Sequence, residues 1–129
     1  MINDLTPLLN VEDVQRTFDF YKRNLGFEIV ETWGDADDPS GGAMSNDGVL
    51  ILVNRPSAPG TEARKGRPTG TDAVFYFGVD DVFTMRARLV ARGVAVSDIE
   101  PTSYGVDEFH AYDPDGYELA FTSPTVTDE

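Results

Sequence analysis

Cysteine is absent from this sequence, histidine occurs once and lysine only twice. Without cysteine the chain can form no disulfide framework, no thiolate metal site and no cysteine nucleophile, and this composition fits a reducing cytoplasm. No stretch approaches the roughly 18 apolar residues of a membrane span, and the first residues lack the cationic start and apolar core of a signal peptide. We therefore expect a cytoplasmic protein that makes no contact with a membrane.

Positive charge is also scarce, because 23 acidic residues outnumber 10 basic ones and leave a net charge of −13. A field of this sign repels phosphate backbones, so nucleic acid is not an expected partner. A surface poor in lysine and rich in aspartate is typical of proteins that stay soluble in high salt. A halophilic source and ordinary bacterial acidity both explain it, and the sequence does not decide between them.

What the chain does contain is an internal repeat. Val11 to Val14 reads VEDV, and VDDV recurs 68 residues later at Val79 to Val82. An apolar run with the length of a strand precedes each copy, and apolar residues at helical spacing follow it. Each helical pattern then stops at a glycine, Gly26 or Gly93, a residue suited to the left-handed position that ends helices.

The rest of each half reads as strands joined by tight turns. Asn46-Asp47-Gly48 and the segment 113–116, Asp-Pro-Asp-Gly, are strong turn signals between apolar runs. The expected strands fall near residues 5–9, 27–33, 41–46 and 49–54 in the first half, and near 73–77, 95–98, 106–112 and 117–122 in the second. Each half is therefore predicted to have the order βαβββ.

We interpret residues 1–129 as a single α+β domain of two tandem βαβββ modules. The first module spans 1–54 and the second spans 72–129. The segment between them, 55–71, is rich in proline and glycine and has no apolar periodicity, so it is expected to be a linker or a flap over a cavity.

Two stretches resemble the glyoxalase/bleomycin resistance protein/dioxygenase superfamily, also called vicinal oxygen chelate proteins. Residues 18–27 read FDFYKRNLGF, and residues 104–121 read YGVDEFHAYDPDGYELAF. The resemblance covers nearly the whole chain. It implies that the two modules form an incomplete barrel around a small-molecule cavity, and that the protein is a homodimer.

Enzymes of this superfamily hold a divalent metal through histidine, glutamine or glutamate. By the resemblance, the three ligand positions fall on Thr6, Val74 and Ala120, none of which is a usual ligand. Glu118 and His110 could add two donors at most, fewer than a stable site needs. The resemblance is therefore to the bleomycin-resistance-like branch that lacks metal ligands, and we predict no metal and no cofactor.

His110, the only histidine, is the best single functional candidate, because imidazole changes charge near neutral pH. Glu108 and Glu118 would form a pair of charged groups around it, suited to a cationic ligand. Trp33, Tyr104 and Tyr112 are the aromatic candidates for stacking on a flat ligand. Each of these residues could instead have no functional role. His110 and the two glutamates would then be solvent-exposed strand residues, and the aromatic residues would serve ordinary packing. If the ligand-equivalent positions face the cavity, strand alternation places Leu8, Asn10 and Tyr76 there too, and places Phe75, Phe77, Leu119 and Phe121 beneath the helices. Arg55 could hold a carboxylate, or form a surface ion pair.

The first function hypothesis is a metal-independent binding protein that sequesters a small antibiotic-like molecule with aromatic or cationic character. The alternative is a lyase, isomerase or dioxygenase of the same superfamily, with His110 and Glu118 in the active site. A structural or regulatory module with a vestigial cavity is a third possibility. Bound metal and turnover would distinguish the enzyme from the binding protein, and a core without a cavity would indicate the structural or regulatory module.

Overall fold

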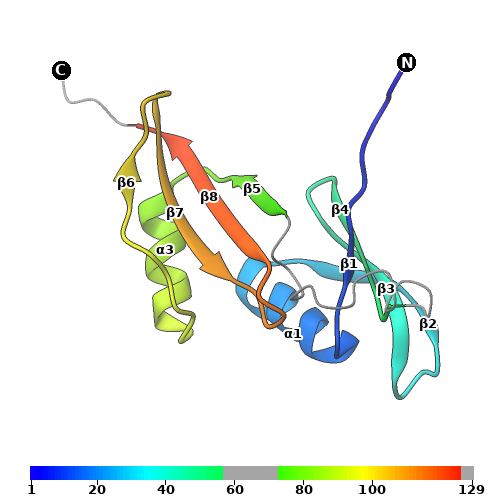
Figure 1. Ribbon diagram of the computed structural model, residues 1–129. Helices are drawn as coiled ribbons and strands as arrows, with labels where there is room; N and C mark the ends of the chain where they lie inside the picture. Colours follow the sequence, from blue (N-terminus) through cyan, green and yellow to red (C-terminus); the bar gives the residue numbers. More distant parts are fainter. Residues whose placement is uncertain (57–72, 126–129) are drawn as a thin grey trace, which may run out of the picture. The chain divides into compact units, whose positions relative to one another are not determined.

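The computed structural model describes residues 1–56 and 73–125. The chain divides into two compact units, Met1–Thr69 and Gly70–Glu129, and each has a strand, a helix and three further strands (Figure 1). The elements of the first unit are β1 (Leu8–Asn10), α1 (Val14–Leu25), β2 (Glu28–Gly34), β3 (Pro39–Asn46) and β4 (Val49–Asn54). Those of the second are β5 (Val74–Gly78), α3 (Val82–Ala91), β6 (Glu100–Pro101), β7 (Val106–Tyr112) and β8 (Glu118–Pro124).

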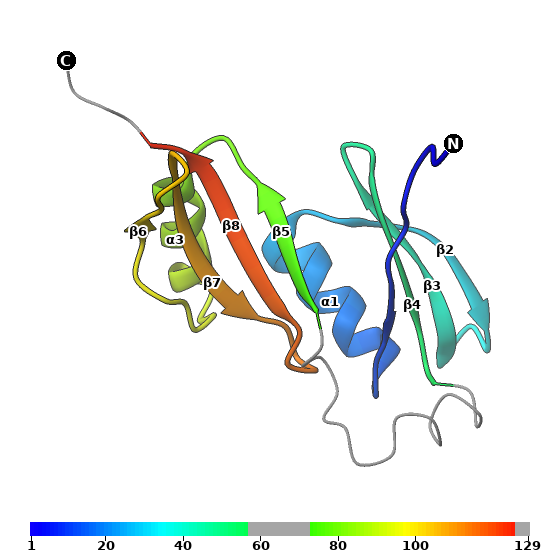
Figure 2. The same ribbon diagram turned by 45° about the horizontal axis from the view of Figure 1, so that its top comes forward.

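Each unit contains one four-stranded sheet with the same connectivity. The strand orders are β1-β4-β3-β2 and β5-β8-β7-β6, and in each sheet the first pair is parallel and the others are antiparallel (Figure 2). Among the strands that the structure describes, neither sheet closes on itself into a barrel. The predicted α+β fold with two βαβββ modules is thus confirmed, whereas a cavity shared by both sheets stays a prediction.

The helices begin and end where local chemistry favours it. Asp13 precedes α1 and its carboxylate accepts the Arg16 backbone N–H at 3.1 Å, while Gly26 ends the helix with φ of 76°. At the start of α3, the Ser123 hydroxyl of β8 accepts the Val82 backbone N–H at 3.0 Å. Within the described residues, no helix is both long and apolar enough to cross a membrane.

The core of each unit lies between the helix and one face of its sheet. In the second unit Phe109 and Phe121 stack at 5.0 Å between ring centroids, and both are buried together with Leu89 of α3. Alternate residues on the strands point the other way, so Val74 and Tyr76 are exposed. We call the sheet face opposite the helix the open face. The predicted alternation of core and opposite-face residues along these strands is confirmed, whereas the open face as the wall of a cavity stays a prediction.

Two expected strands differ from the structure. The first begins at Leu8 rather than Leu5, because Pro7 has no backbone N–H for the ladder, and Leu5 is 85% exposed. The strand expected at 95–98 is absent, and only Val96 forms an isolated bridge there, to Ala111. The paired strand lies two residues further on, at β6. Most of the expected linker or flap, 57–71, lies outside the described residues.

Candidate functional site

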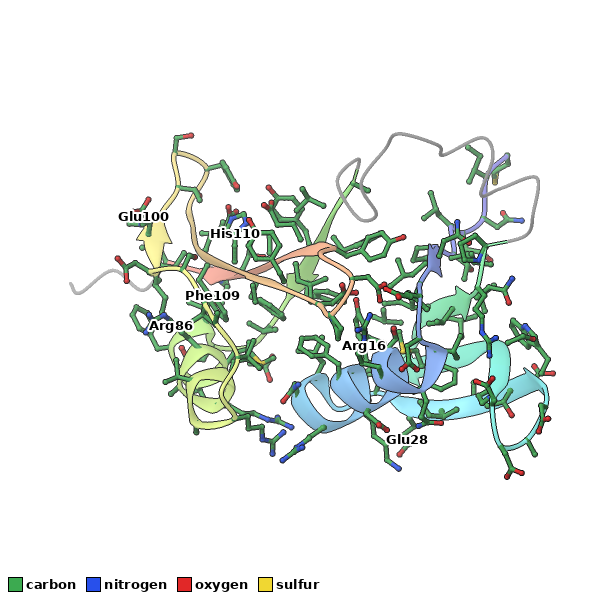
Figure 3. All side chains as sticks on the ribbon, turned by 60° about the horizontal axis from the view of Figure 1, so that its bottom comes forward. Arg16, Glu28, Arg86, Glu100, Phe109 and His110 are labelled. Atoms are coloured by element: carbon green, nitrogen blue, oxygen red, sulfur yellow. The ribbon has the colours of Figure 1, made fainter. Side chains whose placement is uncertain are left out.

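Strand pairing places four residues predicted from the sequence on the open face of the second sheet: Tyr76, Glu108, His110 and Glu118. His110 of β7 lies opposite Ala120 of β8, which in turn lies opposite Tyr76 of β5. Glu118 lies opposite Tyr112. Figure 3 shows Phe109 pointing toward α3 and His110 pointing to the opposite face. A one-residue shift in register would exchange these two faces, so the pairing of β7 with β8 positions the site.

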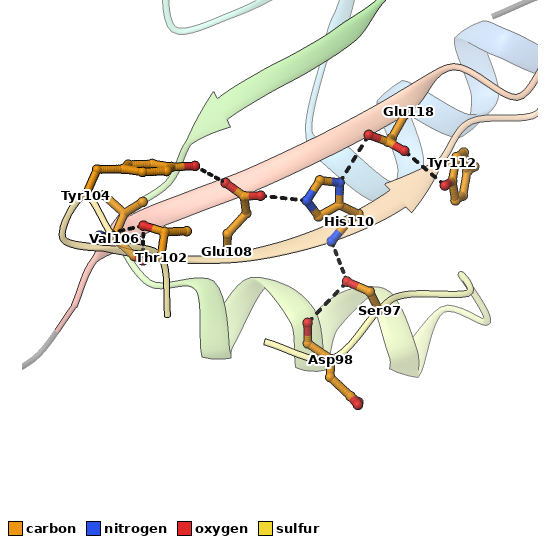
Figure 4. Close-up of polar contacts among 9 residues, drawn as sticks. All are labelled: Ser97, Asp98, Thr102, Tyr104, Val106, Glu108, His110, Tyr112 and Glu118. Atoms are coloured by element: carbon orange, nitrogen blue, oxygen red, sulfur yellow. Dashed lines mark hydrogen bonds and ion pairs between the residues drawn. The ribbon is translucent and has the colours of Figure 1, made fainter. Parts of the chain in front are cut away.

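Five side chains on or beside this face form a continuous series of hydrogen bonds (Figure 4). The central imidazole of His110 contacts Glu108 through Nε2 at 2.7 Å and Glu118 through Nδ1 at 3.3 Å. Tyr104 donates its phenol proton to Glu108 at 2.8 Å, and Tyr112 donates to Glu118 at 3.0 Å. We call this arrangement, Tyr104-Glu108-His110-Glu118-Tyr112, the carboxylate–histidine chain.

The carboxylate–histidine chain is partly shielded from water and carries excess negative charge. The side chains of Glu108 and His110 are 14% and 29% exposed. Both ring nitrogens can donate to carboxylates only when the imidazole is protonated, and even then two carboxylates outnumber one cation. Burial raises the pKa of Glu108, but hydrogen bonds from His110 and Tyr104 outweigh it, so the pKa lies below its ordinary value of 4.5.

The same carboxylates raise the pKa values of the two tyrosines. The hydrogen bond to Glu108 raises the pKa of Tyr104 above its ordinary value of 10.0. The hydrogen bond to Glu118 raises the pKa of Tyr112 in the same direction. Both phenols therefore remain neutral donors at neutral pH, and they orient the carboxylate oxygens that they contact.

A pocket of about 340 Å³ adjoins one end of the carboxylate–histidine chain. Its lining residues are Ser97, Asp98, Glu100, Pro101, Thr102, Glu108 and His110. The first five of these are not among the residues predicted from the sequence. Ser97 also supports the site directly, because its hydroxyl accepts the His110 backbone N–H at 2.8 Å. The bridge between Val96 and Ala111 and the pairing of Glu100 with Glu108 across β6 and β7 bring this segment to the site, and no local sequence signal shows that register.

Trp33 and Arg55, also candidates from the sequence, belong to the first unit. The Trp33 indole N–H donates to the Asn54 side chain at 3.0 Å. Arg55 forms an ion pair with Asp38 at 2.7 Å and also donates to the Pro39 carbonyl oxygen. The surface ion pair therefore accounts for Arg55, and the ligand role of Trp33 stays a prediction.

The metal-ligand positions of the resemblance do not fit a divalent ion. Val74 and Ala120 offer only hydrocarbon, and Thr6 is an exposed hydroxyl. Glu108 and Glu118 contact different nitrogens of the His110 ring, so the three side chains do not converge on one point. Across residues 1–56 and 73–125, no group of three or more His, Cys, Asp or Glu side chains could hold a metal ion.

Comparisons with known proteins agree with this architecture. The antibiotic binding protein TnmS3 from Streptomyces sp. CB03234 is 23% identical with a TM-score of 0.76, covering 96% of this chain and 98% of that one. TioX from Micromonospora sp. ML1 is 20% identical with a TM-score of 0.73, covering 98% and 100%. A glyoxalase/bleomycin resistance protein/dioxygenase superfamily member from Sphaerobacter thermophilus DSM 20745 is 22% identical with a TM-score of 0.74, covering 95% and 98%.

At these identities the structural likenesses establish the fold alone. No curated protein matches the chain in a sequence comparison. The model of one protein family matches residues 2–121, nearly the whole chain. The chain therefore belongs to the glyoxalase/bleomycin resistance protein/dioxygenase superfamily.

Proposed function

We propose that this protein binds a small cationic molecule, without a metal ion, on the open face of its second module. The observation that carries the proposal is the carboxylate–histidine chain beside an acidic pocket. Glu108 takes part in both, and Glu100 and Asp98 also line the pocket, although the Asp98 carboxylate forms an ion pair with Arg86 at 3.7 Å. An ammonium or guanidinium group would gain hydrogen bonds to these oxygens and neutralise their excess charge.

The size and chemistry of the pocket suit such a ligand. Its volume of about 340 Å³ lies within the range of roughly 300–1,000 Å³ typical of small-molecule sites. The exposed side chains of Tyr104 and Tyr112 contact Glu108 and Glu118, and the exposed ring of Tyr76 lies on the same face of the sheet. Aromatic faces attract cations and are used to recognise organic ammonium groups, so these rings suit an organic cation.

The geometry favours binding over acid–base catalysis. A general base needs a nitrogen lone pair that faces the substrate, whereas both ring nitrogens of His110 already contact carboxylate oxygens. The lyase, isomerase or dioxygenase alternative would require this arrangement to open. The description of TnmS3 as an antibiotic binding protein also supports binding, and leads us to propose an antibiotic-like ligand.

The expected homodimer and cytoplasmic location belong to this proposal. Apolar side chains remain exposed on both open faces, Leu8 and Leu50 in the first unit and Val74 and Tyr76 in the second. Contiguous exposed apolar residues on a soluble protein mark surfaces that contact a ligand or another chain. We therefore expect a second copy to cover part of these faces and to help enclose the ligand.

Calorimetric titration with two planar tricyclic probes tests the proposal. Proflavine is a cation at neutral pH and phenazine is neutral with nearly the same shape. We expect proflavine to bind at least about tenfold more tightly, and Glu108→Gln to remove most of that difference, because the variant loses a charge-assisted contact. Equal affinity for the two probes, or unchanged proflavine affinity in Glu108→Gln, would contradict the proposal.

Two controls accompany this titration. Glu31→Gln removes the same charge from an exposed position in β2 of the first unit, and should leave proflavine affinity within about twofold because exposed charges are screened. Adding EDTA should change nothing, since the residues do not fit a metal. Loss of binding with EDTA would overturn the metal-independent part of the proposal.

A further inference from the structure

The segment that pairs with β7 is irregular beside His110. Val96 forms a bridge to Ala111, and Glu100 of β6 pairs with Glu108 of β7. Between these two points one segment advances by four residues and the other by three, so the segment from Val96 to Glu100 contains one extra residue. An extra residue of this kind is a β-bulge, which interrupts the ladder and redirects nearby side chains. The bulge therefore lies next to the backbone of His110.

The side chain of Ser97 replaces a backbone hydrogen bond at this bulge. In a regular hydrogen-bonded antiparallel pair, each residue donates its backbone N–H to the carbonyl oxygen of the other. Ser97 keeps half of this pattern, because its N–H donates to the His110 carbonyl oxygen at 2.9 Å. The His110 N–H instead donates to the Ser97 hydroxyl at 2.8 Å, and that hydroxyl donates to the Asp98 carbonyl oxygen at 3.2 Å (Figure 4). The hydroxyl thus accepts the N–H that the Ser97 carbonyl oxygen would accept in an unbroken strand.

Arg86 of α3 binds the carbonyl oxygen that His110 does not use. Its Nε donates to the Ser97 carbonyl oxygen at 2.8 Å. The same guanidinium lies 3.7 Å from the Asp98 carboxylate, but the Asp98 side chain is 93% exposed, so this ion pair contributes little. The hydrogen bond from a charged donor to the backbone is the shorter and stronger contact. Arg86 therefore ties the bulge to α3.

The bulge forms one wall of the acidic pocket. Ser97 and Asp98 line the pocket from this side, and Glu108 and His110 line it from β7. Regular pairing would turn the Ser97 carbonyl oxygen toward the His110 N–H and displace the hydroxyl. The wall would then move relative to β7. The shape of the pocket therefore depends on which oxygen of Ser97 accepts that N–H.

We infer that Arg86 is a positioning residue for the pocket: by binding the Ser97 carbonyl oxygen, it leaves the hydroxyl as the acceptor for His110 and keeps the bulge in place. This inference rests on the proposed function and deepens it, because it names the contact that gives the cation site its shape. Arg86 is not among the lining residues of the pocket, so it acts through Ser97 rather than on the ligand. Every residue involved belongs to the second unit.

The first test identifies the acceptor of the His110 N–H. Arg86→Met keeps much of the side chain and removes its donors, and Arg88→Met makes the same change at an exposed position on α3. NMR scalar coupling between the His110 amide nitrogen and the carbonyl carbon of residue 97 detects a hydrogen bond between them directly. We expect no such coupling in the unchanged protein or in Arg88→Met, and a measurable coupling in Arg86→Met. A coupling in the unchanged protein, or none in Arg86→Met, would overturn the inference.

Proflavine titration then distinguishes the shape of the pocket from its charge. Arg86→Met removes a positive charge near the acidic pocket, so by electrostatics alone it should bind this cation more tightly. We expect the opposite, an affinity about five- to tenfold weaker, because the pocket wall moves and a ligand contact is lost. Arg88→Met should stay within about twofold of the unchanged protein. Equal or tighter binding by Arg86→Met would contradict the positioning role.

A pair of variants at Ser97 decides the matter if Arg86→Met does not fold. Ser97→Ala removes the hydroxyl and should weaken proflavine binding about three- to tenfold, as expected for one lost hydrogen bond. Ser97→Thr keeps the hydroxyl and should retain the affinity within about twofold. Ser103→Ala removes an exposed hydroxyl from the turn between β6 and β7 and should leave the affinity unchanged. Equal affinities for Ser97→Ala and Ser97→Thr would overturn the inference.

These outcomes separate the role of Arg86 from the proposed function. If proflavine binding depends on Glu108 while Arg86→Met changes neither the coupling nor the affinity, the proposed function stands and the positioning role fails. If proflavine does not bind at all, the proposed function fails, and the coupling to His110 alone decides whether Arg86 holds the bulge.

Discussion

At the scale of single residues, His110 links two carboxylates that would otherwise repel each other. Glu108 and Glu118 bind opposite nitrogens of its ring, at 2.7 and 3.3 Å. Tyr104 and Tyr112 then occupy the remaining carboxylate oxygens. Each group is oriented by its neighbours, so a substitution at one position alters the hydrogen bonds of the others in the carboxylate–histidine chain.

The lowered pKa of Glu108 predicts a specific dependence of stability on pH. Because its pKa is lower in the folded protein than the ordinary 4.5, the ionised form stabilises the fold above about that pH and this contribution is lost as the pH falls through the folded value. Glu108→Gln should therefore lose less unfolding free energy between pH 7 and pH 3 than the unchanged protein. Urea unfolding at both pH values measures this, with Glu31→Gln as the control. Equal losses in all three proteins would contradict the assignment.

At the scale of elements, the turn between β7 and β8 sets the register that assembles the site. The Asp113 carboxylate accepts the backbone N–H groups of Asp115 and Tyr117 at 2.9 and 3.0 Å. Gly116 completes the turn with φ of 88°. The pairing that follows brings His110 opposite Ala120, so a local turn determines where the imidazole lies.

Replacing Gly116 should therefore weaken both the fold and the site. Gly116→Ala forces a β-carbon into left-handed backbone, and we expect the unfolding free energy to fall by about 1–2 kcal/mol. The control is Gly78→Ala, because Gly78 has no positive φ and open space around it, and that variant should be as stable as the unchanged protein or more so. Urea unfolding compares them. Equal destabilisation of both variants would show that the turn conformation is not responsible.

At the scale of the whole molecule, two properties oppose each other. Both open faces expose apolar side chains, including Leu50 at 40% and Val74 at 42%, and burying them would favour association. A net charge of −13 on each chain opposes the approach of a second copy. Salt screens the charge but not the apolar contact, so association should depend on ionic strength.

Sedimentation equilibrium in low and high salt measures this balance. We expect the dimer fraction to rise between 0.05 and 0.5 M sodium chloride, because the Debye length shortens from about 14 to about 4 Å. Leu50→Glu should lower the dimer fraction at both salt concentrations. Phe83→Glu adds the same charge to an exposed apolar position on α3 and should lower it much less. A monomer under all conditions would contradict the expected homodimer.

Much of the fold was predictable because its signals are local. The repeated VEDV and VDDV segments, the glycines after each helix and the Asp-Pro-Asp-Gly turn each depend on a few consecutive residues. Alternation along β5 and β8 likewise predicted which residues face the core. Glu108 and His110 alternate on one strand, and the turn returns Glu118 to the same face, so the sequence also indicated that these residues lie together, as the hydrogen bonds show. Their role in binding stays a prediction.

The sequence by itself therefore determined the two modules, their faces and the central residues of the candidate site. Only the tertiary structure decided the rest, because pairing between strands joins residues that have no local relation. The pairing of β6 with β7 brought Glu100 to the pocket, although a strand was expected at 95–98. The register of β2, β3 and β4 placed Trp33 over Gly41 and against Asn54. Such contacts arise from the packing of whole strands, which no single segment of sequence specifies.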